Sequence, residues 1–126
     1  MKIGIVMGSK SDLLVVKEAV DILKEFEIET ETRIISAHRT PVEAEAFSKG
    51  AKASGIEVII AAAGKAAHLA GVMAASTPLP VIGIPMKTSD LGGLDSLLNT
   101  VQTGSWRRST PARPPRRRLR DRKSVV

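Results

Sequence analysis

Short apolar runs alternate with longer amphipathic stretches over residues 1–102. Runs that are mostly apolar or rich in β-branched residues predict strands at residues 2–7, 29–35, 57–62 and 80–85. The stretches between and after these runs predict helices at residues 12–26, 41–55, 66–76 and 91–102. This repeated strand-helix order predicts an α/β fold with a parallel sheet and helices on both of its faces.

The first predicted helix shows how the apolar face is laid out. Val16, Val20 and Leu23 form one stripe, and Ile22 and Phe26 lie beside it. We expect this stripe to pack on the sheet.

Capping residues mark where the first two helices begin and end. Ser11 is the predicted N-cap of the first helix. Thr40 is the predicted cap of the second, with Pro41 at its first helical position and Gly55 at its end. Since the carboxyl ends of parallel strands share one edge of the sheet, the residues that follow each strand are the candidates for ligand binding.

Composition removes several kinds of chemistry. The chain has 126 residues, no cysteine and two histidines, which excludes disulfides, a thiolate nucleophile and a histidine-rich metal cage. The longest apolar run, near residues 58–63, is far shorter than the roughly 20 residues of a membrane-spanning helix. The N-terminus has no signal-peptide pattern. We therefore expect a cytoplasmic protein with no membrane partner.

The net charge of +6 belongs to the end of the chain. Residues 1–102 hold 10 Lys and Arg against 12 Asp and Glu, whereas residues 103–126 hold 9 against 1. The body is mildly acidic, so we expect no nucleic-acid partner for it.

The first candidate site is the string Gly-Ser-Lys-Ser-Asp after the first strand. It precedes a helix N-terminus, where backbone N–H groups favour an anion. Ser9 and Ser11 can add hydroxyl hydrogen bonds, and Asp12 can accept hydrogen bonds from sugar hydroxyls. The same residue types are common in ordinary turns and caps, so both interpretations stay open.

The loop after the second strand carries stronger chemistry. Arg39 offers a planar fork for phosphate or carboxylate, and His38 suits proton transfer near neutral pH. Ser36 opens the same loop. A solvated surface loop is the alternative, but its position at the expected edge of the sheet favours function.

The loops after the third and fourth strands are less specific. Gly64 allows a ligand to approach the backbone, and His68 lies in a stretch of small residues where it could equally be structural. Gly92 and Gly93 could form a mobile cover over a ligand or an ordinary connector.

Four strings, IVMGSKSD, SAHRTP, AGKAAHLAGV and GLDSLL, together resemble the N5-carboxyaminoimidazole ribonucleotide mutase family, also described as the catalytic subunit of phosphoribosylaminoimidazole carboxylase. The resemblance covers residues 1–102. It implies a flavodoxin-like three-layer α/β/α sandwich, a homo-octamer, and no metal or organic cofactor. Lys65 departs from the family, in which a second glycine is common at this position.

The resemblance also implies the chemistry. The substrate is a ribonucleotide whose carboxylate moves from the exocyclic nitrogen to ring carbon 4 by way of carbon dioxide. The implied small-molecule partners are this ribonucleotide and carbon dioxide or bicarbonate. His38 is then the general acid and base. Ser9, Asp12 and Arg39 match substrate-binding positions, and the remaining expected binding residues are Ser11, Ser36, Gly64 and His68.

Residues 103–126 do not follow the family, which continues with a fifth strand and C-terminal helices. This Arg- and Pro-rich stretch has no apolar periodicity, and we interpret it as the product of a reading-frame shift; a basic arm for RNA or DNA is the alternative. We expect residues 1–102 to form an incomplete nucleotide-binding domain that is marginally stable and prone to aggregate. The functional alternatives are direct carboxylation of aminoimidazole ribonucleotide by carbon dioxide, a non-enzymatic binding module with a basic tail, and an inactive truncated product.

Overall fold

The computed structural model describes residues 1–64, 68–87, 94 and 97. The strands are β1 (Lys2–Met7), β2 (Glu29–Ile34), β3 (Ile56–Ala63) and β4 (Val81–Pro85). The helices are the short 3₁₀ helix η1 (Lys10–Asp12) and the α-helices α1 (Leu13–Glu25), α2 (Pro41–Gly50) and α3 (Leu69–Ala75). All four predicted strands are present, and three of the four predicted helices fall largely within the described residues.

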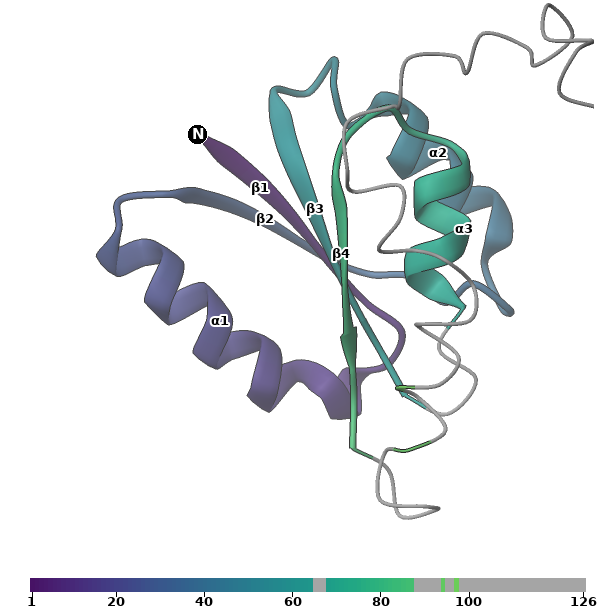
Figure 1. Cartoon of the computed structure of the whole chain (residues 1–126), viewed down its shortest axis with the longest axis horizontal. Coiled ribbons are helices and arrows are strands. Elements are labelled where there is room, and N and C mark those ends of the chain that lie inside the picture. The colour runs from purple at the N-terminus through teal and green to yellow at the C-terminus, as the bar shows by residue number, and fades with distance from the viewer. Residues whose placement is uncertain (65–67, 88–93, 95–96, 98–126) are drawn as a thin grey trace, which may run out of the picture.

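The strands form one parallel sheet in the order β2-β1-β3-β4. The chain moves from β1 outward to β2 and then returns past β1 to β3. Because crossovers between parallel strands are right-handed, this reversal puts the first helix and the later helices on opposite faces. Figure 1 shows α1 on one side of the sheet and α2 and α3 on the other. The predicted α/β/α layering is therefore confirmed.

Each face of the sheet has its own core. On the α2 and α3 side, Val6, Ile59 and Val81 of the sheet are buried in one cluster with Leu69 and Met73 of α3. On the α1 side, Ile3, Ile5 and Met7 of β1 are buried in a second cluster with Val16 of α1. Their side chains point to the face opposite to that of Val6, because side chains alternate along a strand. Near-continuous apolar strands are what a sheet buried on both faces requires.

The start of α1 corrects one prediction. Ser11 is not its N-cap, because residues 10–12 are already wound into η1 and α1 begins one residue later, with Asp12 in the cap position. The capping hydroxyl belongs instead to Ser9, whose side chain accepts a hydrogen bond from the Ser11 backbone N–H and so caps the 3₁₀ turn.

The end of α2 corrects a second prediction. The helix begins at Pro41, after Thr40, as predicted, but it ends at Gly50 rather than at Gly55. Residues 51–55 continue as turns, and Gly55 closes them with a φ of +84°. Glycine suits this left-handed conformation, so Gly55 ends the connection to β3 rather than the helix itself.

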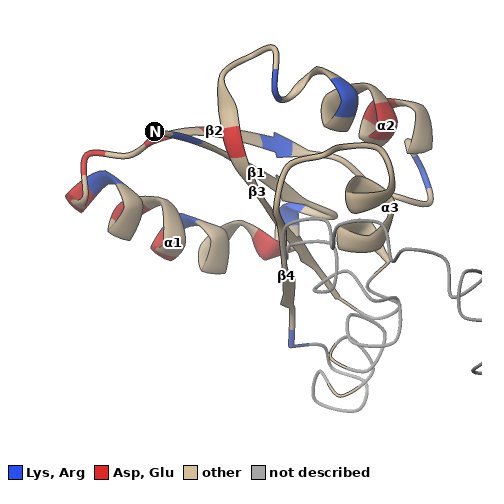
Figure 2. Cartoon of the chain, turned by 45° about the horizontal axis from the view of Figure 1, so that its top comes forward, with Lys and Arg blue, Asp and Glu red and all other residues tan. Residues whose placement is uncertain are grey.

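The outer face of α1 is more apolar than its sequence pattern suggests. Val16 is buried in the sheet contact, as predicted, whereas Ile22 is 54% exposed and Phe26 is 71% exposed. A single helix presents a limited arc to a flat sheet, and these two side chains lie outside it. Figure 2 shows acidic and basic residues interspersed along the same helix.

The far side of the sheet ends at β4. Within the described ranges no strand pairs with its outer edge, and Ile82 is 49% exposed there. The helix expected at 91–102 lies almost wholly outside the described residues, although Leu94 and Leu97 are both helical. Residues 103–126 lie outside them as well. In the part of the chain that is described, no helix has the length and apolarity needed to cross a membrane.

Candidate functional site

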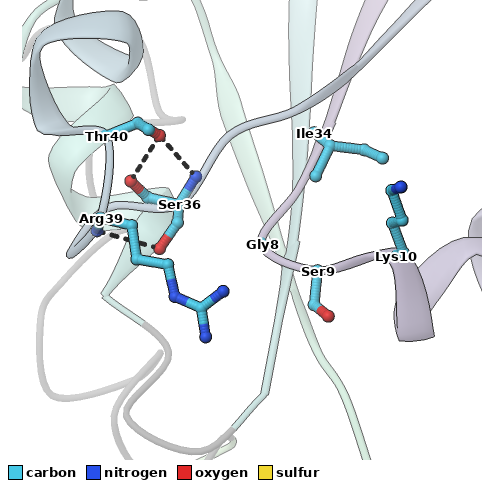
Figure 3. Close-up of a pocket in the computed structure, with 7 residues that line it drawn as sticks. All are labelled: Gly8, Ser9, Lys10, Ile34, Ser36, Arg39 and Thr40. Atoms are coloured by element: carbon cyan, nitrogen blue, oxygen red, sulfur yellow. Dashed lines mark hydrogen bonds between the residues drawn. The ribbon is translucent and has the colours of Figure 1, made fainter.

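The loops after β1 and β2 meet at the carboxyl edge of the sheet and enclose a pocket of about 380 Å³. Described residues from both loops and from the end of β2 line it (Figure 3): Gly8, Ser9, Lys10, Ile34, Ser36, Arg39 and Thr40. This is the edge at which the parallel topology predicted a ligand site.

The loop after β1 is held by its own serine. The Ser9 hydroxyl oxygen accepts from the Ser11 backbone N–H at 3.3 Å and from the Ser11 hydroxyl at 3.0 Å. The Asp12 N–H donates to the Ser9 carbonyl at 3.2 Å, and the Gly8 N–H donates to the Ala62 carbonyl of β3 at 3.1 Å. These bonds fix Ser9 at the pocket wall and leave its hydroxyl hydrogen available to an acceptor in the pocket.

The loop after β2 is braced by Thr40. Its hydroxyl accepts from the Ser36 backbone N–H and donates to the Ser36 carbonyl, both at 3.1 Å. The Arg39 N–H donates to the Ser36 hydroxyl at 3.2 Å. Thr40 therefore occupies the predicted cap position of α2 but makes no side-chain cap bond; its hydroxyl closes the loop instead. His38 and Arg39 are presented from a turn with fixed ends.

Positive charge lines the pocket, and a carboxyl follows in the turn after β1. Lys10 and Arg39 face the pocket, and neither forms an ion pair within the part of the chain that is described. Burial raises the pKa of the Asp12 carboxyl, and a hydrogen bond with the Ser9 backbone opposes that shift. The cations that line the pocket suit it to an anion, and the Asp12 carboxyl two residues after Lys10 is partly desolvated.

The two histidines meet beside the pocket. The ring centroids of His38 and His68 lie 5.6 Å apart, and the rings cross at 68° in an edge-to-face arrangement. His38 comes from the loop after β2, whereas His68 stands at the cap of α3, beyond β3. His38 is exposed and adjacent in sequence to the pocket residue Arg39. The edge of the sheet therefore brings together two residues that are 30 positions apart in the sequence.

The structure separates the predicted site residues into two groups. Ser9, Ser36 and Arg39 line the pocket. The others surround it without being among its described lining residues: Ser11 supports Ser9, Asp12 follows in the same turn, and Gly64, His38 and His68 lie at the same sheet edge. The expected cover at Gly92 and Gly93 lies outside the described residues, as does Lys65.

Sequence reasoning missed four lining residues: Gly8, Lys10, Ile34 and Thr40. Lys10 carried a usable signal, since it lies inside the Gly-Ser-Lys-Ser-Asp string at the carboxyl edge. Ile34 carried none, because an apolar residue at the end of a strand is ordinary. As for metals, the described residues contain no group of three or more His, Cys, Asp or Glu that could hold an ion.

Comparisons with known proteins agree with this architecture. A family model described as AIR carboxylase matches residues 2–106. The N5-carboxyaminoimidazole ribonucleotide mutases of Pyrococcus abyssi and Thermotoga maritima are 57% and 58% identical to this chain over 101 residues. These alignments cover 80% of this chain and 58% and 59% of the relatives, so the chain spans about three fifths of their length.

Solved structures give the same result for the fold. A crystal structure of Treponema denticola PurE superposes with a TM-score of 0.70 at 30% sequence identity, covering 77% of this chain and 63% of that chain. The family match extends over most of the sequence, and the parallel sheet with helices on both faces agrees with the resemblance. The chain belongs to the AIR carboxylase family.

Proposed function

We propose that this chain acts on N5-carboxyaminoimidazole ribonucleotide and converts it to 4-carboxy-5-aminoimidazole ribonucleotide. The observation that carries the proposal is the pocket lined by the cationic side chains of Lys10 and Arg39, with His38 adjacent to Arg39 at the same edge of the sheet. The names of the relatives at 57% and 58% identity support the choice of substrate. An acidic body with a pocket lined by Lys10 and Arg39 suits a small anionic ligand better than an extended polyanion.

The pocket would hold the 5-phosphate of the ribonucleotide. Arg39 supplies a guanidinium fork, and the Ser9 hydroxyl has a hydrogen to donate. Ser36 lines the same wall, although its hydroxyl already accepts from the Arg39 N–H. Asp12, one turn away from Ser9, would accept hydrogen bonds from the ribose hydroxyls. This arrangement leaves the aminoimidazole ring directed toward the histidines.

His38 would carry the proton in both halves of the reaction. In the first half the bond between the exocyclic nitrogen and the carboxyl carbon breaks, carbon dioxide leaves, and the imidazolium of His38 protonates that nitrogen. In the second half carbon 4 attacks carbon dioxide, and the now neutral imidazole removes the hydrogen from carbon 4 as a proton. One residue suffices because the first step leaves it in the form that the second requires. His68, in contact with His38, and Gly64 would border the carboxylate.

Carbon dioxide must stay in the site between the two halves. His38 is exposed in the isolated chain, so further protein surface has to cover it during the reaction. The homo-octamer implied by the family resemblance is the proposed source of that cover.

Direct carboxylation of aminoimidazole ribonucleotide is the second candidate, favoured by the family description as an AIR carboxylase. It would use the same pocket and histidine, with carbon dioxide arriving from solution. The two candidates differ in which ribonucleotide is consumed. Supplying each one separately and measuring the formation of 4-carboxy-5-aminoimidazole ribonucleotide distinguishes them.

The replacement His38→Asn tests the proposal. We expect turnover of N5-carboxyaminoimidazole ribonucleotide to fall by about 10²- to 10⁴-fold, because the amide side chain of asparagine cannot transfer the proton. Calorimetric affinity for the product and the thermal midpoint should stay close to those of the unchanged chain. Absence of turnover in the unchanged chain, or unchanged turnover in the variant, would contradict the proposal.

A further inference from the structure

Lys10 lies in the wall of the pocket, on the side away from Arg39. It belongs to η1, whereas Arg39 comes from the loop after β2. Figure 3 shows the Arg39 guanidinium extending toward Ser9 from one side and Lys10 beside Ile34 on the other. Two cations from separate loops therefore line one pocket, together with Ser9.

Carboxylates pair with three of the other cations that the structure describes. Lys2 and Arg33 each lie 3.0 Å from a carboxylate oxygen of Glu31, and Lys49 pairs with Glu45 one turn away. Lys10 and Arg39 have no such carboxylate among the residues that the structure describes. The charge of these two residues is therefore available to a ligand.

Two such cations suit one class of anion more than others. A phosphate monoester carries about −1.5 to −2 charge at neutral pH, whereas a phosphodiester or a sulfate ester carries a single charge. Coulomb attraction grows with the product of the charges, so each cation adds about twice as much for a dianion. Arg39 can make directional paired bonds, and Lys10 acts as a compact point charge.

We propose that Lys10 is a specificity-determining residue, which together with Arg39 makes this pocket select a doubly charged phosphate monoester over singly charged esters of the same shape. The inference rests on the proposed function, in which the pocket binds the 5-phosphate of a ribonucleotide. It assigns to Lys10 a discrimination between ligands and no part in the proton transfer.

The test compares two sugars that differ in charge but not in shape. Ribose 5-phosphate and ribose 5-sulfate are titrated calorimetrically into the full chain near neutral pH and at low salt, where screening is weak. The variants are Lys10→Gln, Lys10→Arg, and Lys17→Gln as a matched control on α1, away from the pocket lining. The readout is the ratio of the two affinities. A general loss of folding lowers both affinities alike and leaves this ratio unchanged.

The unchanged chain should prefer ribose 5-phosphate. The ratio should fall about two- to fivefold in Lys10→Gln, the range expected for one exposed ion pair, and should stay unchanged in Lys17→Gln. The ratio in Lys10→Arg, which keeps the positive charge, should match that of the unchanged chain. An unchanged ratio in Lys10→Gln, an equal fall in Lys17→Gln, or failure of the unchanged chain to bind ribose 5-phosphate would overturn the inference.

This outcome is separable from that of the proposed function. A ratio that falls as expected in a chain without turnover would leave the role of Lys10 intact and reject the mutase reaction. Turnover that depends on His38, with a ratio that Lys10→Gln does not change, would reject the role of Lys10 alone.

Discussion

In the interior of the sheet, Ile5, Ile59 and Val81 are at most 1% exposed and pack into apolar clusters between strands and helices. At the carboxyl edge, His38 and Arg39 are exposed, and the loops that carry them are held by hydrogen bonds between hydroxyls and backbone. The interior supplies stability through removal of apolar surface from water. The edge supplies chemistry, and its geometry depends on a few polar bonds.

This difference means that the two regions should respond differently to substitution. A change in the interior should lower the free energy of unfolding and leave the ligand preference of the folded molecules intact. A change at the edge should alter binding or turnover with a much smaller effect on unfolding.

The largest stability effect is expected for Ile59→Ala in β3. Ile59 is fully buried in the centre of the sheet, and shortening it leaves a cavity, so the free energy of unfolding should fall by about 2–5 kcal/mol. Ile22→Ala on the exposed face of α1 is the matched control, expected within about 0.5 kcal/mol of the unchanged chain. Urea titration followed by circular dichroism measures both. Equal losses would show that Ile59 is not in the core.

Two glycines, one in each region, give the next comparison. A Cβ on Gly4 would lie 3.1 Å from side-chain atoms of Phe47 and of Ile56, whereas a Cβ on Gly8 would meet nothing closer than 4.0 Å. Gly4→Ala should therefore be less stable than Gly8→Ala by about 1 kcal/mol, at the low end of overpacking costs. Gly8→Ala should instead weaken binding of ribose 5-phosphate, because Gly8 lines the pocket. Thermal unfolding and calorimetry report the two effects, and a reversed order of stability would break the comparison.

The brace in the loop after β2 should matter for function more than for stability. Thr40→Val keeps the shape of the side chain but leaves the Ser36 N–H without its hydroxyl partner, at a cost of about 1–2 kcal/mol. Thr77→Val, which removes a comparable bond from the Leu79 N–H at a distance of 3.3 Å, is the matched control. We expect turnover to fall in Thr40→Val and to be retained in Thr77→Val. Equal kinetics in the two variants would show that the brace does not position His38.

The smallest effect concerns the charge of Asp12. Because burial raises the pKa of its carboxyl on folding, the ionised form costs stability at neutral pH, and this cost disappears as pH falls through the raised pKa. Asp12→Asn should therefore be slightly more stable than the unchanged chain at neutral pH, and the difference should shrink on acidification. Binding of the ribonucleotide should weaken in the same variant.

Glu31 should show the opposite dependence of stability on pH. Hydrogen bonds from Lys2 and then Arg33 lower the pKa of its carboxyl, so its contribution to stability is present at neutral pH and is lost as pH falls through the lowered pKa. Glu31→Gln should destabilise at neutral pH, by less and less on acidification. Urea titrations at several pH values measure the stability difference between each variant and the unchanged chain. At neutral pH this difference should favour Asp12→Asn and disfavour Glu31→Gln, and the same sign for both variants would contradict these expectations.

The sequence predicts the interior better than the edge, for a physical reason. Apolar runs specify strands and buried helix faces directly, so β1 was predicted with its exact bounds and β4 to within one residue. The edge depends on hydrogen bonds between neighbours that no periodicity records. Ser9 rather than Ser11 caps the first turn, and the Thr40 hydroxyl braces a loop rather than a helix end.

The same reasoning explains what was and was not found at the site. Both histidines were expected at one edge, because parallel strands all end there, and the structure brings their rings to 5.6 Å. The string at the carboxyl edge contains Lys10, but its place in one pocket wall with Arg39 depends on how the loops after β1 and β2 fold toward each other. The roles of His38, Ser9, Asp12 and Arg39 toward a substrate stay predictions, as does the nature of residues 103–126.

The most direct test of the central claim is a crystal structure of the His38→Asn variant with N5-carboxyaminoimidazole ribonucleotide bound. We expect the phosphate between Ser9 and Arg39, and the exocyclic nitrogen within about 3.5 Å of the amide that replaces the imidazole. A ribonucleotide seated elsewhere, or one whose ring points away from position 38, would contradict it.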